Sequence, residues 1–346
     1  MKALVVTKPG VVDVIEVASP PARAGEVVIE PRLVGMCGTD LELIDGSIDP
    51  AYVNYPLTLG HEWVGVAVDD VPGVVRAGDH VVVEGVVPCG VCDACRRGET
   101  NRCVIYDEIG FTRPGAAAQR IGVPGALVHR LEAAVEFDDA VFVEPMAVVW
   151  RALTRIPLPS GLEVAIVGDG TIALLAAHLV RLFDPSSIVV IGRREVQSSL
   201  AHAAGAHEFT TTQPEVKFDL VIEAAGTGPA VSSALALAAR GAMVILLGLP
   251  AHGTKVEIAP DDLVNDDLVI QGSFSYTSTS WREVVERVNA RELRPSFLIS
   301  HRFALSEWRD AVAVLRGNVA DDVSRGKVVV SISEPRRSHI RHRPTV

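Results

Sequence analysis

The sequence predicts an α/β protein in two parts, a β-rich region followed by a parallel sheet that is covered by helices. Short Val-rich runs separated by Gly and Pro fill the first 150 residues, and from about residue 160 apolar strands alternate with helical segments. The chain has 346 residues, which is enough for two domains of roughly 100–200 residues each. We therefore expect a β-rich domain over residues 1–150, a second domain over 151–279, and a return of 280–346 to the first.

Composition and charge exclude several classes of protein. The chain is 48% hydrophobic and 22% charged, as in folded globular proteins. Its net charge of −11 would repel a phosphate backbone, so nucleic acid is not an expected partner. No run reaches the roughly 18 apolar residues of a membrane-spanning helix, and the N-terminus lacks a signal-peptide core. We expect a cytoplasmic protein without a membrane partner.

The β-rich region is predicted from short runs bounded by turn residues, a pattern typical of a barrel or sandwich. The expected strands are Val11–Val17, Glu26–Pro31, Trp63–Val68 and Asp79–Glu84.

In the second region strands and helices alternate, which indicates βαβ units and a parallel sheet with both faces covered. The expected strands are Leu162–Val167, Ser187–Ile191, Asp219–Glu223 and Ala242–Leu247, and the helices between them are Thr171–Phe183, Glu195–Ala204 and Pro229–Ala239. Two more helices, Trp281–Asn289 and Leu305–Leu315, precede a strand at Gly326–Ile332 that should return to the first domain. The basic tail Glu334–Val346 is expected to be a loose, solvated terminus.

Four of the five cysteines lie close together in the sequence, at Cys89, Cys92, Cys95 and Cys103. Two-residue gaps allow thiolates to converge on one ion from a tight loop, and four thiolates form a closed, structural zinc site. An iron–sulfur cluster uses similar spacings, and a redox pair is a further alternative. We expect structural zinc.

A second metal site is suggested by Cys37, in Gly-Met-Cys-Gly-Thr-Asp, and by His61-Glu62 further along the chain. A thiolate and an imidazole are ligands of catalytic zinc sites, which leave one position open. The third ligand is a carboxylate, either Glu62 or Glu144, and the sequence does not rank the two.

The segment Gly168-Asp-Gly170-Thr171-Ile172-Ala follows a predicted strand and begins a predicted helix. This G-x-G-x-x-A pattern suits a dinucleotide, because the glycines make the tight turn and let the backbone approach a pyrophosphate. The N–H groups of Thr171 and Ile172 would face the phosphates.

The residues after the second strand of that unit indicate which dinucleotide binds. An NAD site has Asp or Glu there for the ribose hydroxyl groups, whereas this chain has Gly192 followed by Arg193 and Arg194. Guanidinium groups bind a 2′-phosphate through charge-assisted hydrogen bonds. We therefore predict NADP rather than NAD.

Together these motifs resemble the zinc-dependent medium-chain alcohol dehydrogenases over nearly the whole chain. The matching elements are Cys37-Gly-Thr-Asp, Gly60-His-Glu, the four-cysteine segment, Glu144-Pro145, the glycine loop, Leu246-Leu-Gly248 and Gly326-Lys-Val-Val-Val. The resemblance implies a GroES-like catalytic domain, a Rossmann doubly wound sheet, two zinc ions per chain, a homodimer or homotetramer, and Gly248 as a cofactor-binding residue.

Within that family, Glu144 in place of a Cys is similar to the polyol, sugar and threonine dehydrogenase branch. Glu42 and the paired arginines also resemble archaeal-type glucose dehydrogenases, which favours a polyol, sugar or cyclitol substrate. In the expected mechanism zinc lowers the pKa of the alcohol, Thr39 relays its proton, and hydride passes to the nicotinamide.

Three other functions are alternatives to this one. They are a threonine-type or simple alcohol dehydrogenase that uses NAD, a zinc-free reductase of the same superfamily, and a dinucleotide-binding sensor or structural protein without activity. The zinc-free enzyme would need neither Cys37 with His61 nor the four-cysteine segment, and a sensor would be expected to have lost ligands.

Overall fold

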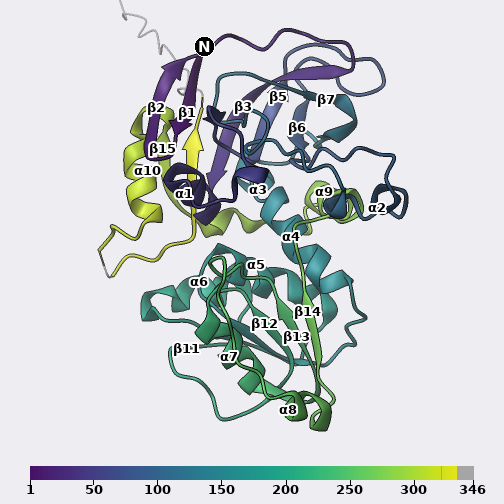
Figure 1. Ribbon diagram of the computed structural model, residues 1–346, viewed down its shortest axis with the longest axis vertical. Helices are drawn as coiled ribbons and strands as arrows, with labels where there is room; N and C mark the ends of the chain where they lie inside the picture. The colour runs from purple at the N-terminus through teal and green to yellow at the C-terminus, as the bar shows by residue number, and fades with distance from the viewer. Residues whose placement is uncertain (321, 333–346) are drawn as a thin grey trace, which may run out of the picture.

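The computed structural model describes residues 1–320 and 322–332, and it confirms the predicted fold class (Figure 1). A β-rich part and a parallel sheet lie at opposite ends of the molecule, with α4 (Val143–Thr154) between them. The prediction for the tail Glu334–Val346 lies outside the described residues. Within those residues, no helix is long and apolar enough to span a membrane.

The β-rich part contains a small sheet and a larger one. The small sheet has the order β2-β1-β4, and the larger one has the order β15-β16-β3-β5-β6-β8, with β7 also paired to β3. Their bounds are β1 Lys2–Lys8, β2 Val11–Glu16, β3 Glu26–Met36, β4 Leu57–Thr58, β5 Glu62–Ala67, β6 His80–Val83, β7 Ile121–Pro124, β8 Val128–Arg130, β15 Ile299–Ala304 and β16 Lys327–Ser331. As predicted, the last strand returns to this part of the chain, where β16 pairs with β3.

The second sheet is entirely parallel, with the order β11-β10-β9-β12-β13-β14. Its strands are β9 Glu163–Val167, β10 Ser187–Ile191, β11 Glu208–Thr210, β12 Phe218–Glu223, β13 Ala238–Leu246 and β14 Val269–Gly272. Strand order reverses between β9 and β12, and ligands of such sheets bind beyond the carboxyl ends of the strands at this point.

Helices cover the parallel sheet and support the β-rich part. They are α5 Thr171–Val180, α6 Ser198–Ala204, α7 Gly228–Leu237, α8 Pro260–Asn265, α9 Ser278–Asn289 and α10 Trp308–Leu315, with α1 Gly38–Asp45, α2 Asp93–Arg96 and α3 Phe137–Ala140 in the β-rich half. Every residue of α5 from Ala173 to Val180 is buried, which explains why this helix is apolar on all sides.

The predicted elements differ from the observed ones mainly at their ends. Strand β3 continues past Pro31 to Met36, because a register shift between Pro31 and Leu33 accommodates the proline within the sheet. The α-helix predicted to reach Phe183 ends at Val180 and continues as a 3₁₀ turn. The extra length of β3 matters for function, because it carries the chain directly to Cys37.

Candidate active site

Strand register brings the first group of predicted site residues together. Gly35 of β3 pairs with Glu62 of β5, and Met36 pairs with Val328 of β16. Cys37 follows the end of β3, so it lies beside His61 and Glu62 at the start of β5. One ligand atom from each of Cys37, His61 and Glu62 lies within 4.8 Å of the other two.

The donor atoms of this group suit zinc. The Cys37 Sγ and His61 Nε2 atoms are 3.1 Å apart. Two atoms bound to one tetrahedral zinc ion at ordinary bond lengths lie roughly 3.5 Å apart. A thiolate, an imidazole and a carboxylate also form a typical catalytic donor set. The group can therefore hold a zinc ion with only small shifts of its side chains.

Asp40, which the sequence analysis did not assign to the site, binds the backbone of Cys37 and lies behind the His61 ring. Its Oδ2 accepts a hydrogen bond of 2.9 Å from the Cys37 backbone N–H, and its Oδ1 lies 3.6 Å from His61 Nδ1. Burial raises the pKa of the Asp40 carboxyl group, and the nearby His61 opposes that shift. A carboxylate behind a metal-binding His orients the ring and increases its basicity. The position of Asp40 three residues after Cys37 is the signal that could have identified it.

The carboxylate of Glu62 also forms an ion pair with Lys327 at the start of β16. Both side chains are almost fully buried, at 3% and 2% exposure. Burial lowers the pKa of Lys327, but the negative charges of Glu62 and Cys37 outweigh it and raise the pKa overall. The site therefore contains a buried positive charge that sequence analysis missed.

Glu144, the other predicted carboxylate, enters from the first turn of α4 and lies outside the group of three. Burial, together with the charge of Glu62, raises the pKa of Glu144 to about 8. Thr39, the predicted proton relay, is half-buried in the first turn of α1.

A fourth acidic residue, Glu108, lies near this group on a loop that packs against His61. The Phe111 ring is centred 5.2 Å from the His61 ring. Tyr106 donates its phenolic hydrogen to Glu108, and burial raises the pKa of the Glu108 carboxyl group. The loop thus brings a carboxylate close to the group of three, and no sequence motif predicts its presence there.

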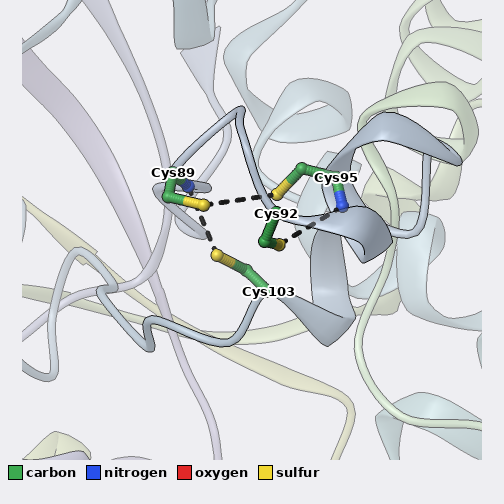
Figure 2. A group of neighbouring side chains, drawn as sticks. All are labelled: Cys89, Cys92, Cys95 and Cys103. Atoms are coloured by element: carbon green, nitrogen blue, oxygen red, sulfur yellow. Dashed lines mark hydrogen bonds between the residues drawn. The ribbon is translucent and has the colours of Figure 1, made fainter.

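The four remaining cysteines converge around α2 (Figure 2). The Cys89 and Cys95 sulfur atoms are 4.0 Å apart, and Cys103 Sγ accepts a hydrogen bond of 3.3 Å from the Cys89 N–H. Sulfur ligands of one tetrahedral zinc ion lie roughly 3.8 Å apart. Backbone N–H groups of Cys95 and Val104 lower the pKa of Cys92 to about 6, which favours the thiolate form that binds metal. All five cysteines are free of disulfide bonds.

The glycine loop connects β9 to α5 at the switch point of the parallel sheet. Gly168 has a φ of +132° and donates its N–H to the Ile191 carbonyl at 2.8 Å. Gly170 caps α5, and a Cβ atom added there would meet no atom within 4 Å. Thr171 and Ile172 form the first turn of α5, where backbone N–H groups have no partner within the helix.

Gly248, another predicted cofactor residue, lies against the backbone of Gly226. An added Cβ would be 2.2 Å from the Gly226 nitrogen, and the Gly248 N–H donates to the Glu223 carbonyl at 3.1 Å. A glycine is therefore required here by close packing of two backbone segments.

The prediction of NADP rather than NAD is based on the residues that follow β10. A Cβ at Gly192 would lie 2.6 Å from the Phe209 ring, so an acidic side chain would fit there only if the ring moved. The Arg193 side chain is exposed. Arg194, in contrast, forms an ion pair of 2.8 Å with Asp169 of the glycine loop.

A β-rich part, a parallel sheet with a glycine-rich loop at its switch point, and two groups of side chains that could hold a metal ion are features of a zinc-dependent dehydrogenase. Residues 23–133 match the Alcohol dehydrogenase GroES-like domain, and residues 170–290 match the Zinc-binding dehydrogenase domain. The chain belongs to the zinc-dependent medium-chain alcohol dehydrogenase family, and it is an enzyme of that class.

Three relatives illustrate the match. Sorbitol dehydrogenase of Bacillus subtilis is 28% identical, covering 90% of this chain and 92% of its own. Galactitol 1-phosphate 5-dehydrogenase of Escherichia coli is 29% identical, covering 95% and 99%. The solved structure of a zinc-binding dehydrogenase from Sinorhizobium meliloti, bound to NADP, is 27% identical with a TM-score of 0.87, covering 95% and 98%.

Proposed function

We propose that this dehydrogenase interconverts a secondary alcohol of the polyol, sugar or cyclitol type and its carbonyl, with NADP(H) as the cofactor. The observation that carries the proposal is the group formed by Cys37, His61 and Glu62 beside the end of β3. It combines a zinc donor set with a carboxylate, Asp40, whose Oδ1 lies 3.6 Å from the Nδ1 atom of the His.

In this proposal Cys37, His61 and Glu62 would hold the catalytic zinc, and Glu144 is the neighbouring carboxylate whose pKa is raised by burial and by the charge of Glu62. Zinc bound there supplies a Lewis acid, which lowers the pKa of an alcohol hydroxyl group. Lys327 balances the charge of Glu62, since an unpaired buried carboxylate is costly. The hydroxyl group of Thr39 accepts the proton of the alcohol and passes it toward solvent.

The four cysteines Cys89, Cys92, Cys95 and Cys103 hold the second zinc, which has only a structural role because four thiolates leave no open position. The proposal therefore requires two zinc ions per chain.

NADP supplies the hydride acceptor in the oxidation of the alcohol. The backbone of Gly168 and Gly170 and the N–H groups of Thr171 and Ile172 bind its pyrophosphate. The residue at position 192 supports NADP, because Gly192 has no carboxylate to repel a 2′-phosphate and Phe209 crowds the space that an acidic side chain would need.

Glu108 supports a substrate with several hydroxyl groups. Its carboxylate is held by Tyr106 on the loop that packs on His61, where it can accept a hydrogen bond from a hydroxyl group next to the reacting carbon. A polyol could add a second donor to this carboxylate beside Tyr106, whereas a simple alcohol could not.

A substrate panel tests the proposal. Polyols, aldoses, cyclitols, simple secondary alcohols and threonine are each incubated with NADP⁺ or NAD⁺, and reduction of the nicotinamide is followed at 340 nm. We expect oxidation of a polyhydroxy substrate with kcat/KM at least about tenfold higher for NADP⁺ than for NAD⁺. Higher activity on threonine or simple alcohols, or a preference for NAD⁺, would contradict it.

We also propose that the enzyme is a cytoplasmic homodimer or homotetramer. The edge strand β14 leaves Val269 49% exposed, and Val264 of the neighbouring α8 is 79% exposed. An open edge with apolar side chains is a common pairing surface. Light scattering after gel filtration measures the mass, and a monomer would refute the assembly.

A further inference from the structure

We propose that Arg325, in the segment just before β16, forms the binding site for the 2′-phosphate of NADP together with Arg193. The inference rests on the proposed NADP preference and adds a residue from a distant part of the chain. It also changes the role of Arg194, which the sequence suggested as a phosphate ligand.

Arg194 is already occupied by the glycine loop. Its Nη2 and Nε atoms donate to the two carboxylate oxygens of Asp169, at 2.8 and 3.2 Å. Asp169 Oδ2 also accepts hydrogen bonds from the backbone N–H groups of Arg193 and Arg194, at 2.9 and 3.1 Å. These contacts neutralise the charge of Arg194 and fix the turn after β10, so Arg194 has a positioning role and the exposed Arg193 side chain is left for a ligand.

A buried glutamine joins Arg325 to the same turn. Gln197 is fully buried, and its Nε2 donates both to the Asp169 carbonyl at 2.7 Å and to the Arg325 carbonyl at 2.8 Å. Its Oε1 accepts the Arg325 N–H at 2.7 Å. Because one side chain holds both backbones, Arg325 is fixed beside the glycine loop although it comes from the other end of the chain.

The cluster has an excess of positive charge. Among the residues that the structure describes, no carboxylate pairs with Arg193 or Arg325. Burial and the neighbouring Arg194 lower the pKa of Arg325, while Asp169 opposes that shift. The guanidinium groups of Arg193, Arg194 and Arg325 lie around a single carboxylate, that of Asp169, so two positive charges are left for a ligand. A phosphate dianion matches that excess and the planar donors of arginine.

The test uses the zinc-loaded, full-length enzyme and a pair of nucleotides that differ only in the 2′-phosphate. Adenosine 2′,5′-bisphosphate and adenosine 5′-monophosphate are titrated calorimetrically into the wild type, Arg325→Met and Arg325→Lys. Arg316→Met is the matched control, since Arg316 is a nearby exposed arginine that pairs with Asp45.

We expect Arg325→Met to weaken the bisphosphate by about tenfold or more and to leave the monophosphate unchanged. Arg325→Lys should lose less, because it keeps the charge but not the planar donors, and Arg316→Met should behave as the wild type. The backbone contacts of Gln197 do not depend on the Arg325 side chain, so the fold should survive.

Two results would overturn the proposal in different ways. If the wild type prefers the bisphosphate and Arg325→Met retains that preference in full, the Arg325 assignment is wrong while the NADP proposal stands. If the wild type binds both nucleotides equally, the NADP proposal fails, and the site at Arg325 fails with it.

Discussion

Replacing Gly170 by Ala should separate cofactor binding from stability. Gly170 has φ −88° and ψ −178°, a conformation open to any residue, and an added Cβ would have no neighbour within 4 Å. The substitution should leave stability nearly unchanged, because the lower entropy of the unfolded chain offsets the poorer N-cap that Ala provides for α5. In the bound enzyme the same methyl group would occupy the space through which the pyrophosphate approaches the backbone.

Gly168→Ala provides the matched comparison. Gly168 has a φ of +132°, and its added Cβ would lie 3.0 Å from the Ala224 carbonyl carbon. Strain in that region of backbone space costs on the order of 1–3 kcal/mol. Gly168→Ala should therefore melt at a lower temperature than the wild type, whereas Gly170→Ala should not.

Two measurements test whether this loop binds the cofactor. They are the thermal unfolding midpoint of each variant and the Kd of NADPH, which is obtained by following NADPH fluorescence during a titration. For Gly170→Ala we expect a nearly unchanged midpoint and at least about tenfold weaker binding, or about 1.4 kcal/mol. Wild-type affinity in a normally folded Gly170→Ala enzyme would refute the assignment of this loop to the cofactor.

Three further predictions concern residues around the two sites. In the zinc-free enzyme, Lys327→Met leaves Glu62 buried without its partner and should lower the free energy of unfolding in urea by about 3–5 kcal/mol. Adding Glu62→Gln should recover part of the loss, and equal stabilities of the single and double variants would contradict the ion pair. Gly192→Asp places a side chain against the Phe209 ring and should lower the free energy of unfolding by about 1–3 kcal/mol. Adding Phe209→Ala should relieve part of this loss. If the shifts in melting temperature of the two substitutions are strictly additive, the two side chains do not contact each other. Burial and the neighbouring Arg181 lower the pKa of His178 to about 4, so the unfolded chain takes up this proton at a higher pH than the folded chain. The free energy of unfolding should therefore fall by up to about 3 kcal/mol as the pH drops from about 6.5 to 4. In His178→Asn this part of the pH dependence should vanish, and the same dependence as in the wild type would contradict the assignment.

Sequence patterning was sufficient for the fold class because each half of the chain repeats one period. Apolar runs such as Ser187–Ile191 coincide with an observed strand, and the glycine loop lies between a strand and a helix as predicted. Spacing alone also placed the four cysteines on one loop, because sequence neighbours within a short loop remain neighbours in space.

Contacts between distant segments could not be predicted in this way. Lys327 reaches Glu62 because β16 pairs with β3 in one particular register, and no local pattern specifies that register. Arg194 resembled a free phosphate ligand in the sequence, whereas the structure pairs it with Asp169 from another βα turn. The sequence identified the types of chemical group at the site, and strand pairing determined which of them meet.

The central claim is that Cys37 and His61 hold a catalytic zinc ion that is separate from the four-cysteine site. Metal content by mass spectrometry, measured together with turnover, tests it most directly. The wild type should contain two zinc ions per chain, and Cys37→Ser should contain one, with a normal fold and no measurable turnover. A Cys37→Ser enzyme that retains both zinc ions and the wild-type rate would contradict the account.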